Sequence, residues 1–185
     1  MICKFKLIID HPRAIKIIFI ALILIKLVLV SRLNTYVLPT ENHDDMLMFE
    51  RAVSITGGRW LGPYNQLTLS KGVFFTSWLA VLNLFSIPLL IGNELLYIAS
   101  CLVFVFSIKS IINNKLLMVL IFIVLLFNPI SLGFIPMLRI YRDPVSPALT
   151  MLIFSGVIGT FLHKNDSGKM LLFSCITGSG LSAAW

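Results

Sequence analysis

Long apolar runs, separated by short charged segments, dominate the chain. Each run approaches the roughly 20 residues that a helix needs to cross a bilayer. Because an unpaired backbone is too costly in lipid, such runs are helices, and the alternating pattern of barrel strands is absent. The pattern predicts an all-α integral membrane protein, with four transmembrane helices and the start of a fifth at 15–33, 89–108, 116–135, 145–162 and 170–185.

The first apolar run follows a basic N-terminus that contains Lys4, Lys6, Arg13 and Lys16. Basic residues before a first span hold the N-terminus in the cytoplasm. No small-residue cleavage site follows the run, so we expect an uncleaved signal anchor. The next segment should therefore emerge on the outer side of the membrane.

That outer segment, residues 34–88, begins with a polar stretch rich in charges, glycine and proline. From Met46, apolar residues recur at helical spacing, which predicts an amphipathic helix lying in the interface. Between Lys71 and Lys109, Glu94 is the only charge. That interval is too long for one span and slightly short for two.

Two topologies compete for residues 72–88, which either form an embedded helix or cross the membrane. With the embedded helix, the cytoplasmic side receives eight Lys and Arg residues and the outer side six, and with a second crossing these numbers are reversed. The positive-inside rule favours the embedded helix. Residues 136–147 then form a second outer loop, on the same side as the first.

Composition agrees with a membrane protein, since 58% of the 185 residues are hydrophobic and 12% are charged. The formal net charge of +7 lies mostly between apolar runs, where it orients the chain, and no nucleic-acid partner is predicted. The three cysteines are widely separated, which supports neither a disulfide framework nor a zinc site. These features exclude a soluble domain and give no metal site.

Two clusters of charge are candidates for chemistry. Asp44 and Asp45 open the predicted interfacial helix, either as general-base carboxylates or simply as charges that suit the helix N-terminus. Arg139 and Arg142 precede Asp143 in the second outer loop, either binding a lipid-linked phosphate or extending to lipid headgroups. Because both clusters are expected on one side, carboxylates and phosphate-binding cations would converge there. This set of residues fits glycosyl transfer from a lipid-linked donor, and it also fits several other membrane chemistries.

Two single charges lie within apolar runs. Lys26 is either functional inside the first span or extended toward the outer interface. Glu94, near the start of the second span, is expected at the interface or hydrogen-bonded within the bundle.

The linear order of these features resembles the start of the C-type (GT-C) membrane glycosyltransferases, family 39-like. The closest branch contains protein O-mannosyltransferases and the lipid A aminoarabinose transferase. Its first outer loop carries Asp-Glu, a helix, Gly-x-Trp and Lys-Pro-Pro. The corresponding residues here are Asp44-Asp45, Gly58-Arg59-Trp60 and Lys71-Gly72-Val73, followed in the second loop by Asn128-Pro129, Arg139 and Asp143.

The resemblance implies a glycosyltransferase that uses a polyprenyl-phosphate sugar donor and acts on an extracytoplasmic lipid, glycan or protein. Asp44 would be the catalytic base, with Asp45 and Asp143 beside it, although Asp45 departs from the usual Glu. Lys71 with Arg139 or Arg142 would face the donor phosphate. No cofactor is predicted, and the carboxylates leave dependence on a divalent metal open.

We expect a bacterial inner membrane protein, and the apolar run that reaches residue 185 suggests the N-terminal part of a longer enzyme. The alternative is a non-catalytic polytopic protein, such as a transporter of lipid-linked sugars or a subunit for envelope assembly.

Overall fold

The computed structural model describes residues 12–36, 42–63, 72–131 and 138–184. Within these ranges the chain is all-α, apart from an isolated bridge between Tyr36 and Arg139. The longer helices are α2 (Pro12–Val30), α5 (Leu89–Ile108), α7 (Ser146–Leu162) and α8 (Ser167–Ala184). The shorter elements are α3 (Asn42–Thr56), α4 (Val73–Leu84), α6 (Lys115–Leu126) and the 3-10 turns η2 (Pro129–Ser131) and η4 (Asp143–Val145).

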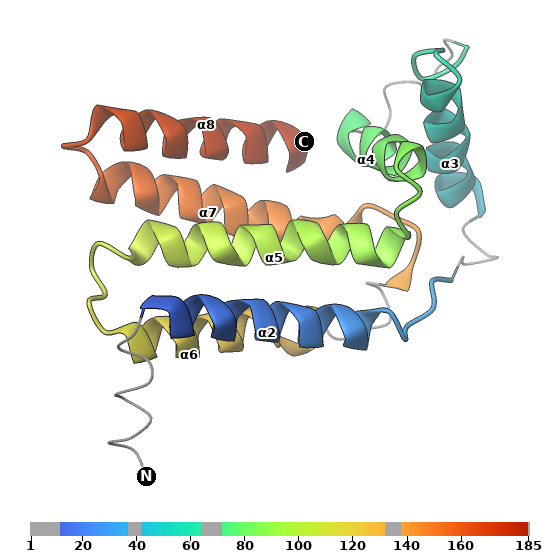
Figure 1. Cartoon of the computed structure of the whole chain (residues 1–185). Helices are drawn as coiled ribbons and strands as arrows, with labels where there is room; N and C mark the ends of the chain where they lie inside the picture. Colours follow the sequence, from blue (N-terminus) through green and yellow to red (C-terminus); the bar gives the residue numbers. More distant parts are fainter. Residues whose placement is uncertain (1–11, 37–41, 64–71, 132–137, 185) are drawn as a thin grey trace.

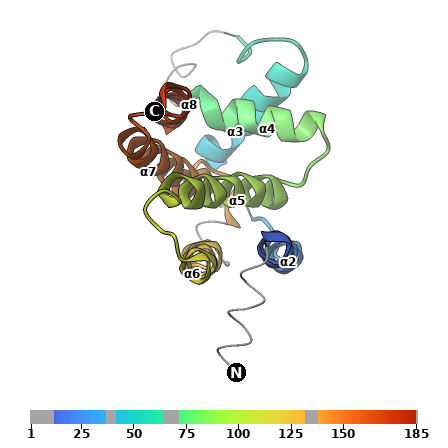
Figure 2. The same ribbon diagram turned by 60° about the vertical axis from the view of Figure 1, so that its left-hand side comes forward.

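A bundle of α2, α5, α6, α7 and α8 runs along one direction, and α3 and α4 lie across one end of it (Figure 1). Viewed closer to the bundle axis, α5 separates α2 and α6 on one side from α7 and α8 on the other (Figure 2). We call the end where α2 finishes and α5 and α7 begin the α3/α4 end. The predicted helices of the first outer segment therefore gather at one end of the bundle.

The central helix α5 supplies most of the main core. Its residues Tyr97, Ile98 and Cys101 are buried against Phe122 and Leu126 of α6. Residues of α2 complete this cluster, including Phe19, whose ring stacks on Phe122 with centroids 4.3 Å apart. The side of the bundle that contains α2 and α6 and the side that contains α7 and α8 are thus joined through α5.

Close backbone packing joins α7 to α8. A Cβ atom at Gly156 would meet the backbone N of Thr177 at 2.7 Å and the carbonyl oxygen of Phe173 at 2.8 Å, and one at Gly159 would collide with the Phe173 ring. Glycine lets two helices approach closely in this way. A short turn at residues 163–166 makes the two helices an antiparallel hairpin.

Two described helices, α5 and the segment Asp143–Leu162, have the length and apolar composition to cross a membrane. The bounds of α5 coincide with the expected span at 89–108, whereas α4 and α6 are shorter apolar helices. At about 1.5 Å per residue, neither reaches the roughly 30 Å of a hydrocarbon core. Both helices are therefore shorter than a full span.

Helix α6 differs from the expected span at 116–135, because it ends at Leu126. The Asn128-Pro129 pair explains the early end, since proline disfavours helical geometry at the preceding residue and lacks an N–H donor. A 3-10 turn over Pro129–Ser131 follows, and residues 132–137 lie outside the described ranges.

Candidate functional site

Two connections that are far apart in sequence meet at the α3/α4 end. The N–H of Tyr36 donates to the carbonyl of Leu138 at 3.1 Å, and the N–H of Ile140 donates to the carbonyl of Tyr36 at 3.3 Å. These bonds form the isolated parallel bridge between Tyr36 and Arg139. The start of the first predicted loop is therefore attached directly to the segment that carries Arg139, Arg142 and Asp143.

Packing of α3 provides a second link between these regions. Met48 is fully buried in a cluster with Phe75 of α4 and with Val145 and Leu149. The Thr76 hydroxyl donates to the Met48 sulfur at 3.3 Å. Met48 thus holds α3 against the turn that follows Asp143.

The predicted carboxylates Asp44 and Asp45 belong to the first turn of α3, one turn before Met48. Their side chains lie outside the described part of the structure, as does Lys71. The described part of α3 also contains Arg51, which is 4% exposed. Burial lowers the pKa of the Arg51 guanidinium, which nevertheless stays protonated at neutral pH.

The second predicted cluster surrounds Tyr141. The guanidinium carbon of Arg139 lies 4.7 Å from the centroid of the Tyr141 ring, and that of Arg142 lies 5.9 Å away. Both distances suit cation–π contacts. Asp143 is exposed and is the first residue of η4, followed in sequence by Pro144.

A cavity of about 220 Å³ lies between α4, α7 and α8 at the α3/α4 end. Arg142 lines it together with the hydroxyl-bearing residues Ser146 and Thr150. Its remaining lining is mostly apolar and comes from Gly72, Phe74, Phe75, Val145, Leu149, Ala183 and Ala184. One cation, two hydroxyl groups and apolar walls suit a phosphate attached to a hydrocarbon.

The N-terminus of α4 borders the same cavity. Gly72 is the N-cap of α4 and lacks a side-chain capping bond. The first N–H groups of a helix and its dipole favour an anion, and Arg142 adds a full positive charge. The cavity therefore unites Arg142 with the residue that follows Lys71, whereas Arg139 and Asp143 do not line it.

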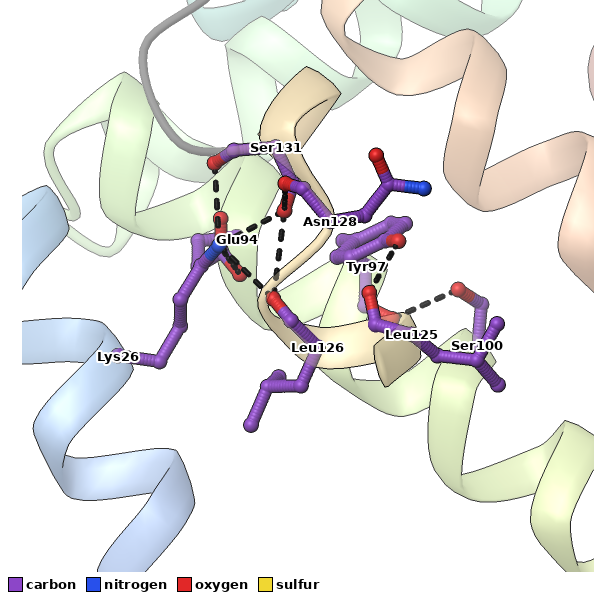
Figure 3. A network of polar contacts seen from close by, with 8 residues as sticks. All are labelled: Lys26, Glu94, Tyr97, Ser100, Leu125, Leu126, Asn128 and Ser131. Atoms are coloured by element: carbon purple, nitrogen blue, oxygen red, sulfur yellow. Dashed lines mark hydrogen bonds and ion pairs between the residues drawn. The ribbon is translucent and has the colours of Figure 1, made fainter. Parts of the chain in front are cut away.

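Inside the bundle, Lys26 forms a polar network that the sequence analysis did not predict (Figure 3). Its side chain is fully buried, and Nζ donates to the Leu126 carbonyl at 2.9 Å, the Ser131 carbonyl at 3.1 Å and the Ser131 hydroxyl at 2.7 Å. Nζ also lies 3.7 Å from Oε1 of Glu94. Lys26 does not extend outward, and Glu94 lies within the bundle.

A sequence signal for this pair existed. Lys26 lies four residues before the end of α2 at Val30, and Glu94 lies five residues after the start of α5 at Leu89. Opposite charges at similar heights in neighbouring antiparallel helices are natural partners. The missing information was that α2 packs on α5.

The network continues along α5. The Tyr97 hydroxyl donates to the Leu125 carbonyl at 2.7 Å, and Nε1 of Trp78 donates to Oδ1 of Asn93 at 2.9 Å. A second cavity, of about 50 Å³, is lined by Asn93, Glu94, Tyr97 and Ser131 among other residues. Within the described ranges, Nδ2 of Asn93 and Oε1 of Glu94 are buried without a hydrogen-bond partner.

The described residues contain no group of three His, Cys, Asp or Glu side chains that could hold a metal ion. No protein-family model, curated protein or solved structure matches the chain.

Proposed function

We propose that this chain is part of an integral membrane glycosyltransferase that transfers a sugar from a polyprenyl-phosphate-linked donor to an acceptor outside the cytoplasm. The observation that carries the proposal is the cavity of about 220 Å³, in which Arg142 and the N-terminus of α4 adjoin apolar walls. A polyprenyl phosphate has the same two parts, an anionic head and a hydrocarbon chain. Arginine suits the head because its guanidinium pairs with phosphate oxygens in a bidentate manner.

The distribution of side chains supports a membrane location. Large apolar side chains are exposed along the bundle, among them Ile17 (65%), Val124 (70%) and Phe161 (73%), while Lys26 and Glu94 are buried. A soluble protein rarely exposes so much apolar surface, whereas intramembrane charges normally face the interior of a bundle. The α3/α4 end would then lie at the outer face, as the positive-inside rule indicates for this chain.

The proposed reaction assigns each predicted residue a role. Asp44 accepts the proton of the acceptor hydroxyl or amine while the acceptor atom bonds to the anomeric carbon. The bond from that carbon to the phosphate oxygen breaks, and the polyprenyl phosphate leaves. Arg142, with Lys71, stabilises the departing phosphate, and Asp45 and Asp143 orient the acceptor. Arg139 does not line the cavity and instead lies over the Tyr141 ring.

Measurement of donor binding tests whether the cavity binds the lipid phosphate. In purified full-length protein in phospholipid nanodiscs, Arg142→Gln should weaken binding of undecaprenyl phosphate about tenfold or more, since one charge-assisted contact is lost. Arg32→Gln is the matched control, because Arg32 is exposed at the end of α2 and does not line the cavity. Equal affinity of wild type and Arg142→Gln would refute the assignment.

Measurement of sugar transfer tests whether Asp44 is the general base. Asp44→Asn should reduce sugar transfer by about 10²- to 10⁴-fold, as expected for loss of a general base, while membrane insertion stays unchanged. The competing hypothesis is a non-catalytic polytopic protein. It predicts no transferase activity in the wild type and an Asp44→Asn protein that behaves identically.

A further inference from the structure

The cavity of about 50 Å³ beside Lys26 is lined by two residues that each have one buried, unpaired polar atom. Asn93 and Glu94 are each only 6% exposed, and both line this cavity. Among the described residues, Nδ2 of Asn93 and Oε1 of Glu94 have no hydrogen-bond partner. Native proteins rarely leave such groups unpaired, so each of them is expected to have a partner.

The amide orientation of Asn93 is fixed by Trp78. An indole N–H can only donate, and Nε1 of Trp78 lies 2.9 Å from Oδ1 of Asn93. The amide NH₂ is therefore the group left for the cavity. Its partner must accept a hydrogen bond.

Lys26 does not satisfy Glu94. An ammonium group has three N–H donors, and those of Lys26 go to Leu126 and twice to Ser131. At 3.7 Å, Oε1 of Glu94 is an electrostatic neighbour of Nζ without a hydrogen bond from it. The partner of Glu94 must donate a hydrogen bond.

A hydroxyl group meets both requirements, because it donates one hydrogen bond and accepts others. The cavity has room for a few water-sized groups, since one water needs roughly 10–15 Å³ of such volume. The edge of a sugar ring fits this space, but a whole sugar does not. Recognition would thus involve one or two hydroxyl groups.

The two cavities share one short segment. Pro144 and Pro147 line the smaller cavity, while Arg142, Val145 and Ser146 line the larger one. In a polyprenyl-phosphate sugar, the phosphate and the sugar are directly bonded. A donor that used both cavities would place its phosphate at Arg142 and its sugar at Pro144.

We propose that Asn93 and Glu94 form a hydroxyl-binding subsite for the sugar of the donor, with Asn93 donating to the sugar hydroxyl and Glu94 accepting from it. This inference rests on the proposed function, because that function supplies the sugar. Lys26 is a positioning residue, since it holds Ser131 and the charge of Glu94 beside the cavity.

Saturation-transfer NMR with free glycosides tests the subsite without the lipid phosphate. Full-length protein in nanodiscs is titrated with methyl α-glucoside and methyl α-mannoside, and with a permethylated glucoside that accepts hydrogen bonds but donates none. At least one free glycoside should give saturable transfer, and the permethylated one should give none. Absence of transfer from both free glycosides, or equal transfer from the permethylated compound, would mean that the cavity holds only water and would overturn the proposal.

Variants locate the binding. Asn93→Leu should weaken glycoside binding about tenfold, as expected for one lost hydrogen bond. Asn83→Leu is the matched control, because Asn83 is exposed on α4 and does not line this cavity. Unchanged binding by Asn93→Leu would overturn the proposal, and the permethylated probe keeps the test decisive if that variant does not fold.

The donor itself distinguishes the two proposals. In wild type, undecaprenyl-phosphoryl glucose or mannose should bind several-fold more tightly than undecaprenyl phosphate, and Asn93→Leu should remove this gain without changing affinity for the bare phosphate. Failure of the bare phosphate to bind would contradict the proposed function alone, provided that the glycosides still bind. A gain that persists in Asn93→Leu would contradict the subsite alone.

Discussion

The bundle joins its helices in two different ways on the two sides of α5. On one side, α7 packs closely on α8, with Gly156 against backbone atoms of α8 and Gly159 against the Phe173 ring. On the other side, α2 meets α5 and the end of α6 through the Lys26 ammonium and its oxygen partners. The first contact is mainly close packing, with one hydrogen bond between the hydroxyls of Thr160 and Ser174, whereas the second adds charge and hydrogen bonds to the apolar cluster around Phe19 and Phe122.

This difference concerns unpaired polar atoms. Among the described residues, the Lys26 side leaves buried atoms of Asn93 and Glu94 without a hydrogen-bond partner beside a cavity, whereas the contact between α7 and α8 leaves none. The larger cavity lies where α7 and α8 meet α4. Substitutions on the two sides of α5 should therefore differ in their effect on stability.

Removal of the buried cation should have the largest effect. Lys26→Met leaves Glu94 buried without its counter-ion, which costs about 3–5 kcal/mol of the free energy of unfolding. The double variant Lys26→Met/Glu94→Gln should recover much of this loss, because no charge remains unpaired. Lys16→Met, at an exposed position of the same helix, is the control. Denaturant unfolding in detergent measures the differences, and equal stability of Lys26→Met and Lys16→Met would show that the pair is irrelevant.

On the side of α7 and α8, Gly156→Ala should destabilise the hairpin. The added methyl group would meet backbone atoms of α8, which cannot rotate away, and overpacking of this kind costs about 1–3 kcal/mol. Gly178→Ala is the control in α8, because a Cβ there meets nothing within 4 Å. We expect it to be neutral or stabilising by up to about 1 kcal/mol through helix propensity. The same unfolding assay applies, and the reverse ranking would contradict the packing described.

A single interhelical hydrogen bond should matter less. Tyr97→Phe removes the donor to the Leu125 carbonyl and should lower the free energy of unfolding by about 1 kcal/mol. Ser107→Ala removes a bond within α5, from Ser107 to the Phe104 carbonyl, and should cost less because it joins no helices. If the two variants lose equal stability, the Tyr97 bond does not contribute to helix association.

The smallest effect belongs to the turn between α7 and α8. Hydrogen bonds from the side chain and backbone of Lys169 hold the pKa of Asp166 below its ordinary value. A folded-state pKa below the unfolded value means that this carboxylate stabilises the protein above pH about 4 and that the contribution is lost as pH falls through the folded pKa. Asp166→Asn should lower Tm slightly at pH 7 and match the wild type at strongly acidic pH. A constant Tm difference across that range would contradict the assignment.

Much of the architecture could be predicted from local signals. Pro88 and Lys109 bracket α5, so its limits follow from the sequence. The Asn128-Pro129 pair carried the information that α6 stops early, but the apolar residues beyond it suggested a longer span. Hydropathy marks where apolar residues lie and does not by itself mark where a helix ends.

The candidate site was predictable in part. Arg142 was identified as a charge beside an apolar run, and it lines the larger cavity. The Lys26–Glu94 pair and the unpaired Nδ2 of Asn93 depend on contacts between α2, α4 and α5. The hydrophobic periodicity of one sequence does not reveal such contacts. Interactions between distant segments therefore account for most of what the sequence did not predict.

We expect the α3/α4 end to face the outer side of a membrane and to carry both clusters of predicted site residues. The most direct measurement is thiol labelling of intact cells with a membrane-impermeant reagent, in protein whose Cys3, Cys101 and Cys175 are replaced by alanine. Single cysteines introduced at positions 44 and 143 should be labelled from outside, whereas those at 113 and 166, at the opposite end of the bundle, should be labelled only after permeabilisation. Labelling of positions 44 and 143 from opposite sides would contradict the account.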